Sequence, residues 1–266
     1  MSKRADVLCV EKGLFLSREQ AKRAINEGIV FCNNQRITKP SLKLEDSDEL
    51  VIVGEKLKYV SRGGLKLEKA IQYFNLDLKN CIMMDIGSST GGFTDCALQN
   101  GAKMVYAIDV GTDQLVESLR NDSRVVVYEQ TNFRHVTLDM FEKGLPNFAS
   151  IDVSFISLKH IFKPLSQILK KDCYFVALIK PQFEAGKNEV NKKGIITDRL
   201  THKKVILNVM EYAHNEGMCM KGLTYSPVSS DIGNIEFLGL FKNANEQDAF
   251  INIQNIVDEA HLHFKG

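Results

Sequence analysis

From residue 81 onward, short apolar runs alternate with stretches in which apolar residues recur at helical spacing. The apolar runs predict strands at about residues 81–86, 103–109, 124–129, 148–154, 173–180, 218–226 and 234–241. The stretches between them predict helices at about 92–100, 113–120, 137–143, 158–170 and 199–216, and a last amphipathic helix follows Phe250. This alternation is typical of an α/β fold whose parallel sheet is covered on both faces. Only a polar segment, residues 226–233, separates the last two strands, so we expect them to pair antiparallel.

The N-terminal part of the chain follows a different pattern. Ser17 precedes apolar residues at helical spacing and Gly28 follows them, which predicts a short helix with an N-cap and a glycine stop. Short apolar runs then predict strands joined by polar turns. We therefore expect a small α+β domain over residues 1–58 and a larger domain over residues 59–266, with a linker at 59–64.

The composition is that of a soluble globular protein. The 266 residues are 44% hydrophobic and 25% charged, and no apolar run is long enough to cross a bilayer. No signal-peptide core follows the first residues, and the six cysteines are scattered, so we expect a cytoplasmic protein. No Cys, His or acidic cluster has metal-ligand spacing, so no metal is expected. We expect His202 and the other histidines to be surface or capping residues.

Basic residues gather near the N-terminus, although the net charge of the chain is only +1. Residues 1–44 contain nine Lys or Arg against four acids. A positive face matches the phosphate backbone of RNA, and the candidate contacts are Arg4, Arg18, Lys22, Arg23 and Arg36. The same charges also fit an ordinary solvated helix face, so charge alone leaves both interpretations open.

The stretch from Ile82 to Phe93 joins a buried strand to a helix through a tight turn rich in glycine and hydroxyl residues. Glycines let the backbone approach a ligand, and the helix N-terminus offers free N–H groups. The predicted cofactor contacts in this turn are Asp85, Gly87, Ser88, Ser89, Thr90, Gly91, Gly92 and Phe93. Both a dinucleotide and S-adenosylmethionine fit such a turn.

Two further residues belong to the predicted cofactor site. Asp109 ends the next strand, where an acid would hold the ribose hydroxyls of a nucleoside, and Asn132 after the third strand would reach the adenine. The full glycine spacing that a pyrophosphate requires is absent from the turn. This absence favours S-adenosylmethionine over a dinucleotide.

Four charged residues converge on the same edge of the predicted sheet. Asp152 and Lys180 end strands, Glu236 opens the last strand, and Lys66 lies just after Gly63-Gly64 at the start of a helix. Each residue alone fits a rim charge, a helix cap or a lysine that reaches out to water. Together, two lysines and two acids around one cofactor suit the deprotonation of a weakly acidic hydroxyl.

Both parts of the chain resemble known families. The N-terminal part is similar to the S-four RNA-binding domain, through Arg4-Ala5-Asp6, Leu8, Ser17-Arg18-Glu19-Gln20-Ala21, Ile25, Gly28 and Val30. The whole chain resembles the TlyA family, in which such a domain precedes a methyltransferase domain like that of the FtsJ/RrmJ enzymes. The matching motifs are Ser61-Arg62-Gly63-Gly64-Leu65-Lys66-Leu67, Asp85 to Asp95, Asp109-Val110-Gly111, Asp152 to Leu158, Lys180-Pro181-Gln182-Phe183-Glu184 and Gly233 to Phe237.

The resemblance implies a Rossmann-like methyltransferase fold and transfer of methyl from S-adenosylmethionine to a ribose 2′-OH of ribosomal RNA. It implies cytidine in assembled ribosomal subunits as the target and Lys66, Asp152, Lys180 and Glu236 as the catalytic tetrad. Lys180 is our candidate base, since burial and neighbouring cations favour its neutral form. The connector Tyr59-Val60-Ser61-Arg62 departs from the Arg-Ala-Trp-Ser linker of the best-known member, and the chain has no Trp.

Three alternatives have less support in the sequence. A pseudouridine synthase would share the N-terminal domain but needs an Arg-Leu-Asp motif, and the chain has only Asp198-Arg199-Leu200. TlyA relatives are often labelled haemolysins, but no stretch here is suited to a membrane, so no stable membrane association is expected. A non-catalytic RNA-binding assembly factor would not require the tetrad. The loop 186–194 and the helix start after it are basic, which favours an RNA-gripping lid.

Overall fold

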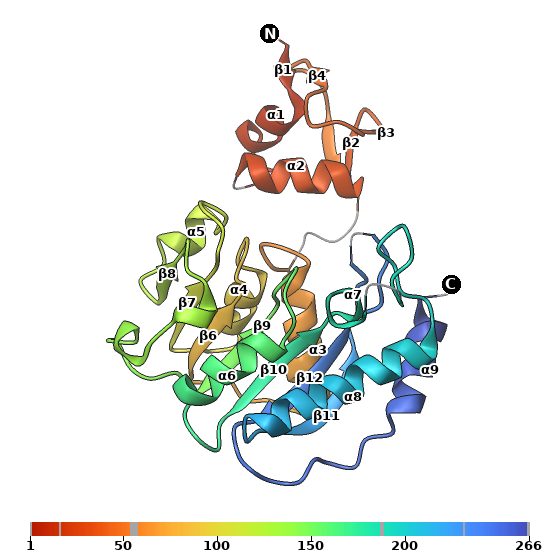
Figure 1. Cartoon of the computed structure of the whole chain (residues 1–266). Helices are drawn as coiled ribbons and strands as arrows, with labels where there is room; N and C mark the ends of the chain where they lie inside the picture. The colour runs from red at the N-terminus through yellow and green to blue at the C-terminus, as the bar shows by residue number, and fades with distance from the viewer. Residues whose placement is uncertain (1, 16, 54–57, 187–188, 231, 265–266) are drawn as a thin grey trace. The chain divides into compact units, whose positions relative to one another are not determined.

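The computed structural model describes residues 2–15, 17–53, 58–186, 189–230 and 232–264, and only the backbone of Glu19, Arg23, Asn26 and Glu27. The chain divides into two compact units, Met1–Lys58 and Tyr59–Gly266 (Figure 1). Each unit has its own hydrophobic core.

The first unit combines two helices with short strands. The helices are α1 (Ala5–Glu11) and α2 (Arg18–Glu27), and the strands are β1 (Lys3–Arg4), β2 (Val30–Cys32), β3 (Gln35–Arg36), β4 (Lys43–Leu44) and β5 (Leu50–Ile52). Strands β3, β2 and β5 form an antiparallel sheet, and β1 pairs with β4. The core is formed by Ala5, Leu8, Cys9, Ala21, Ala24, Ile25, Val30, Ile37, Leu44 and Leu50.

The predicted ends of helix α2 are confirmed. The Ser17 hydroxyl accepts a hydrogen bond from the N–H of Gln20 at 3.3 Å and so caps the first turn. Gly28 adopts a left-handed conformation, with φ of 76°, and ends the helix. The face of α2 that carries Ala21, Ala24 and Ile25 is buried in the core.

The second unit is built on a seven-stranded sheet. Its strands are β6 (Ile82–Ile86), β7 (Met104–Ile108), β8 (Val125–Tyr128), β9 (Phe148–Ile151), β10 (Tyr174–Ile179), β11 (Cys219–Tyr225) and β12 (Phe237–Lys242), in the order β11-β12-β10-β9-β6-β7-β8. Strands β6 to β10 are parallel, whereas β12 runs antiparallel to both β10 and β11. The expected antiparallel final pair is therefore confirmed.

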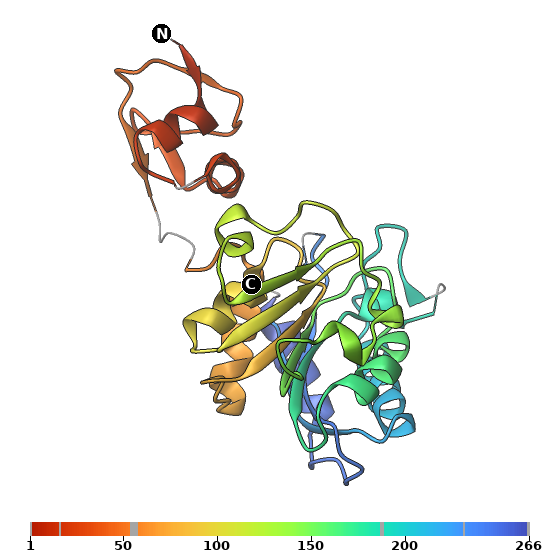
Figure 2. The same cartoon turned by 90° about the vertical axis from the view of Figure 1, so that its left-hand side faces the viewer.

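Helices cover both faces of this sheet, as Figure 2 shows. One face carries α3 (Gly63–Phe74), α4 (Gly92–Gln99) and α5 (Glu117–Arg120), and the other carries α6 (Lys159–Ile168), α8 (Arg199–Asn215) and α9 (Ile253–His263). Successive strand residues point to opposite faces: Met83 packs with the first layer and Met84 with the second. Burial on both faces explains why the central strands are continuous apolar runs.

Two predicted helices were wrong in extent or type. The prediction at 113–120 shortens to α5, because the Glu129 carboxylate accepts hydrogen bonds from the N–H groups of residues 113–115 and holds them as a loop. The prediction at 137–143 gives only 3-10 turns, η1 (Phe133–His135) and η2 (Leu138–Met140). A short helix, α7 (Pro181–Glu184), was not predicted.

Membrane-spanning helices and metal-binding clusters are both absent from the described residues. Within these residues, no helix combines the length and apolar character needed to span a bilayer. The same residues contain no group of three His, Cys, Asp or Glu side chains placed to hold a metal ion.

Candidate active site

The four residues of the predicted tetrad meet at the carboxyl edge of the parallel strands. Asp152 directly follows β9, and Lys180 directly follows β10. Because β12 is antiparallel, Glu236 just before its first residue lies at this same edge. Lys66 comes from the first turn of α3. The edge is where doubly wound sheets bind their ligands.

The tetrad forms a continuous chain of ion pairs. The Lys66 ammonium lies 2.9 Å from a Glu236 carboxylate oxygen and 3.6 Å from one of Asp152. The other Asp152 oxygen lies 2.5 Å from the Lys180 ammonium. Asp152 therefore bridges the two lysines, and each lysine is held at a fixed position.

Burial makes these charges depend on one another. The side chains of Lys66 and Lys180 are 12% and 10% exposed, and that of Glu236 is 2% exposed. Burial alone lowers the pKa of Lys66, but attraction to Asp152 and Glu236 outweighs it and the pKa is raised. Burial alone raises the pKa of Asp152, but the two lysines outweigh it and the pKa is lowered. Both groups are therefore charged at neutral pH.

Two polar residues that sequence reasoning missed complete the network. The Lys180 ammonium donates a hydrogen bond to the Ser154 hydroxyl at 2.9 Å. The Gln182 amide donates to the second Glu236 oxygen at 3.2 Å, and its own carbonyl oxygen is buried without a hydrogen-bond partner. Ser154 lies in the strand-end motif Asp152 to Leu158, and Gln182 lies in the motif Lys180 to Glu184. Their place in these motifs could have identified both residues from the sequence.

Glu184 is a partly buried acid close to the tetrad. Its carboxylate accepts hydrogen bonds from the Ser157 hydroxyl at 2.6 Å and the Leu158 N–H at 2.8 Å. Burial raises its pKa to about 7, although these hydrogen bonds lower it. Glu184 thus ties α7 to the start of α6, and so fixes the loop that carries Asp152 and Ser154.

The glycine-rich turn lies against the tetrad. Gly87 has a φ of 85°, and a Cβ at this position would lie 2.4 Å from the Asp152 carbonyl oxygen. A Cβ at Gly92 would lie 2.8 Å from the Gly64 nitrogen, so α4 and α3 touch through glycine backbones. This contact brings Lys66 close to the turn. Ser89 is exposed at the turn, whereas Gly91, Gly92 and Phe93 are buried.

Asp85 has a different role from the one expected. Its side chain is fully buried, and its two oxygens accept hydrogen bonds from Thr94 at 2.7 Å and Ser150 at 2.9 Å. Burial raises its pKa to about 6, although the two hydroxyl donors lower it. Asp85 therefore joins β6, α4 and β9 beneath the turn and has no surface left for a cofactor.

Asp109 and Asn132 both lie at the carboxyl edge. Asp109 accepts hydrogen bonds from the N–H groups of Ser89 and Gly111, each at 2.7 Å, and so links the turn to the next loop. The Asn132 side-chain oxygen accepts a hydrogen bond from the N–H of Arg134 and caps η1. Both side chains are partly exposed.

Glu129 is a positioning residue that the sequence did not reveal. It accepts hydrogen bonds from three loop N–H groups and from Arg120 at 2.7 Å, and these bonds lower its pKa to about 2. The loop it holds supplies Leu115, which with Leu119 fills the space where a Cβ of Gly91 would lie. Glu129 thereby holds the loop whose Leu115 packs against the glycine-rich turn.

An aromatic depression opens beside the tetrad. It has a volume of about 570 Å³ and is lined by Arg134, Phe155, Ile156, Ser157, His160 and Phe183. Phe155 is 90% exposed and has a φ of 62°, which is unusual for a bulky residue. Its ring centroid lies 5.0 Å from that of Phe183. Phe155 follows Asp152 by only three positions, and the Phe183 ring centroid lies 5.9 Å from the Lys180 ammonium, so the depression adjoins the charged site.

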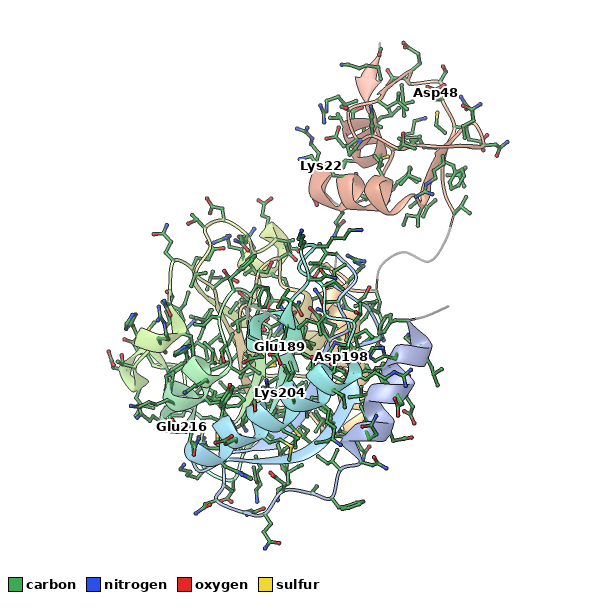
Figure 3. All side chains as sticks on the ribbon, turned by 45° about the vertical axis from the view of Figure 1, so that its right-hand side comes forward. Lys22, Asp48, Glu189, Asp198, Lys204 and Glu216 are labelled. Atoms are coloured by element: carbon green, nitrogen blue, oxygen red, sulfur yellow. The ribbon has the colours of Figure 1, made fainter. Side chains whose placement is uncertain are left out.

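In the first unit, two of the predicted RNA contacts share one buried acid. Asp6 is fully buried, and it accepts hydrogen bonds from Arg4 at 2.9 Å and from Arg18 at 3.1 Å. Both guanidinium groups remain partly exposed. Arg36 is exposed, Lys22 is half-buried on α2 (Figure 3), and the side chain of Arg23 lies outside the described part of the structure.

Comparison with known proteins identifies the family. A sequence model of the FtsJ-like methyltransferase family matches residues 59–243, and one of the S4 domain matches residues 3–50. The chain is 35% identical over 259 residues to the 16S/23S rRNA (cytidine-2'-O)-methyltransferase TlyA of Mycobacterium tuberculosis, a match that covers 97% of this chain and 96% of the relative. The chain belongs to the TlyA family.

Two other TlyA-like proteins are more similar in sequence. YqxC of Bacillus subtilis is 54% identical over 235 residues, which cover 88% of this chain and 84% of YqxC. A solved structure from Streptococcus thermophilus, described as a hemolysin, has a TM-score of 0.81 and 50% identity, and the match covers 99% of this chain and 97% of that one. The family and the methyltransferase fold predicted from the sequence are confirmed.

One prediction about this TlyA family chain was wrong. Neither His202 nor His261 is a surface or capping residue. His202 is fully buried and His261 on α9 is also buried, with Nδ1 of His202 2.9 Å from Nε2 of His261. Burial and repulsion from His261 lower its pKa to about 4. The helical spacing of α8 places His202 on the same face as Val205 and Val209, and this spacing could have indicated from the sequence that His202 is buried.

The basic loop expected to grip RNA is partly neutralised within the chain. Lys204 on α8 pairs with Glu189 at 2.8 Å, and Asp198 caps the start of α8 (Figure 3). Arg199 pairs with Asp258. Lys187 lies outside the described residues. Because these ion pairs neutralise part of the positive charge, the RNA-gripping lid stays a prediction.

Proposed function

We propose that this protein transfers a methyl group from S-adenosylmethionine to a ribose 2′-OH of ribosomal RNA. The observation that carries the proposal is the chain of ion pairs Lys66, Glu236, Asp152 and Lys180 beside the glycine-rich turn. Such a set can hold a hydroxyl and accept its proton without a metal ion. Family membership supports the same reaction class.

The turn fits S-adenosylmethionine through its backbone. A Cβ at Gly87 would clash with Asp152 and one at Gly91 with Leu115 and Leu119, so these glycines let the turn pack closely at the edge where the cofactor would lie. Asp109 would hold the ribose hydroxyls and Asn132 would lie on the adenine side. The turn from Ser88 to Phe93 would contribute those backbone N–H groups that do not already bond to Ile108, Asp109 or Ser88. When bound, S-adenosylmethionine supplies an electrophilic methyl group, so the protein has to orient the acceptor.

Lys180 would take the proton of the 2′-OH as the oxygen attacks the methyl carbon. The Asp152 carboxylate and the Ser154 hydroxyl fix the position of its nitrogen. Lys66 and Glu236 would position the ribose and its phosphate.

The target nucleotide would place its base in the aromatic depression. Phe155 and Phe183 offer ring faces on which a base extruded from its helix could stack, next to the tetrad that needs its ribose. In the first unit, Arg4 and Arg18 would contact RNA phosphates. A cytidine of ribosomal RNA is the proposed target, as the name of the Mycobacterium relative indicates. We propose that the RNA is presented in assembled ribosomal subunits and that the reaction takes place in the cytoplasm.

Transfer of labelled methyl from S-adenosylmethionine to purified ribosomal subunits tests this function. We expect label in the RNA with the wild-type protein, and none with Lys180→Ala. Lys103→Ala, an exposed lysine before β7, is the matched control and should transfer methyl normally. Absence of label with the wild-type protein, on either subunit or on free RNA, would reject the proposed function.

A further inference from the structure

A basic ridge leaves the aromatic depression along α6. We use this name for Arg134 and His135 of η1 and Lys159, His160 and Lys163 of α6, all of which are exposed. Helix α6 packs against η1, so the two groups of basic residues come from neighbouring elements. Arg134 and His160 also line the depression itself. The ridge therefore begins where the target base is proposed to sit.

The ridge contains no acidic residue of its own. Neither residues 130–138 nor residues 153–171 include an Asp or Glu. Among the acids that the structure describes, none forms an ion pair with any of the five ridge residues. In contrast, Arg4, Arg18, Arg120 and Lys204 elsewhere in the chain all pair with acids. The Lys159 ammonium lies 5.8 Å from the centroid of the Tyr212 ring and Arg134 donates a hydrogen bond to Asn132, and neither contact neutralises the charge of the ridge.

This arrangement works against the stability of α6. Lys159 is the first residue of the helix, where the helix dipole disfavours a cation, although the Ser157 hydroxyl accepts a hydrogen bond from its N–H at 3.2 Å and Glu184 accepts one from the Leu158 N–H. Lys163 lies four residues later, where a second lysine repels the first. Acidic residues at these positions would stabilise the helix more than lysines do. Residues that break a local rule without a structural gain indicate a functional requirement.

We infer that the basic ridge binds the phosphate backbone of the RNA strand that flanks the target nucleotide. The inference rests on the proposed function, because it needs an RNA whose target base occupies the depression. Lys159 and Lys163 lie about 6 Å apart along the helix axis, so they can face successive parts of one backbone. Arg134 and His160 then face the phosphates next to the target.

An anionic membrane surface fits the ridge less well. Interfacial helices bury an apolar face beside their cations, and the outward face of α6 lacks one. The apolar side chains of α6, which are Ile161, Phe162, Leu165 and Ile168, are buried in the core. The exposed aromatic residue nearest the ridge, Phe155, points to the depression that the RNA base would need.

The test compares two full-length variants with the same loss of charge. Lys159→Gln/Lys163→Gln removes two charges from the ridge, and Lys103→Gln/Lys170→Gln removes two exposed lysines from the opposite edge of the sheet. The measurement is the affinity for a fluorescently labelled ribosomal RNA fragment as a function of salt concentration. The affinities for S-adenosylmethionine and for vesicles of anionic phospholipid are measured in parallel.

The ridge variant should bind the RNA fragment about 25-fold more weakly at about 0.1 M salt, because two single-strand phosphate contacts contribute a salt slope of about 1.4. Its salt slope should fall by that amount, while its affinity for S-adenosylmethionine and that of the control variant for RNA stay unchanged. Equal losses in both variants would overturn the inference. So would unchanged RNA binding with loss of vesicle binding, which would assign the ridge to a membrane. Failure of the wild-type protein to methylate RNA would instead reject the proposed function, since the binding comparison does not require catalysis.

Discussion

At the scale of single residues, Asp152 joins the two halves of the active site. Its carboxylate contacts both Lys66 and Lys180, and removal of one partner from a buried ion pair leaves the other charges without compensation. Asp152→Asn should therefore lower kcat by about 100-fold or more through misplacement of the base. S-adenosylmethionine affinity should change little. A parallel loss of affinity would show that Asp152 acts mainly on the cofactor seat.

Two buried titratable residues give the protein opposing responses to acid. The pKa of His202 is lowered to about 4, so between pH 6.5 and 4 the unfolded chain binds a proton that the folded chain does not. His202 therefore destabilises the fold as pH falls through this range. The pKa of Asp85 is raised to about 6, so the folded chain takes up the proton first and stability rises as pH falls. Each effect amounts to about 3 kcal/mol.

Single variants should reveal each response. Relative to the wild type, His202→Gln should gain unfolding free energy as pH falls from 6 to 4, because the destabilising response of His202 is removed. Asp85→Asn should lose stability more steeply over the same range. Urea denaturation at several pH values measures both. Parallel stability curves for the three proteins would show that neither residue titrates in this way.

At the scale of elements, the loop between β7 and α5 is held by Glu129 and supports the glycine-rich turn. Glu129→Gln would weaken the hydrogen bonds from Arg120 and from three backbone N–H groups. We expect the KM for S-adenosylmethionine to rise about tenfold while kcat stays nearly constant, since a bond to a charged group contributes about 1.5–3 kcal/mol. Titration calorimetry with S-adenosylmethionine would measure the same change.

A neighbouring carboxylate provides the control for this prediction. Asp122 pairs with Arg124 at 2.7 Å but holds no part of the loop. Asp122→Asn should therefore leave the KM for S-adenosylmethionine unchanged. Equal effects from both substitutions would mean that Glu129 contributes only general stability.

The order and type of the main elements could be predicted because burial on both sheet faces leaves a clear pattern. The β10 strand, Tyr174–Ile179, is almost entirely apolar, and the α6 helix shows helical spacing. The helix predicted at 113–120 is shorter in the structure because Glu129, which follows β8, accepts hydrogen bonds from the N–H groups of residues 113–115. Such a tertiary hydrogen bond leaves no local trace in the sequence.

The candidate site was predictable where strand ends carry charge. Asp152, Lys180 and Glu236 follow or precede apolar runs, so topology alone brings them together. The burial of Asp85 was not predictable, because its partners Thr94 and Ser150 come from two other elements. A strand-end carboxylate looks the same in the sequence whether it faces a ligand or the core.

At the scale of the whole molecule, the two units have separate cores and separate proposed tasks. No residue of the first core belongs to either core of the second unit. Deletion of residues 1–58 should therefore leave S-adenosylmethionine binding intact and weaken binding to ribosomal subunits, with a smaller salt slope. Filter binding at several salt concentrations measures this. Unchanged subunit binding would contradict an RNA-docking role for the first unit.

The central claim is that the methyl group goes to a ribose 2′-oxygen. Alkaline hydrolysis of the labelled RNA tests it directly, because a 2′-O-methyl group removes the nucleophile that cleaves the adjacent phosphodiester. We predict that the label will be recovered in alkali-resistant dinucleotides after reaction with the wild-type protein and will be absent with Lys180→Ala. Label recovered in single nucleotides would place the methyl group on a base and contradict the account.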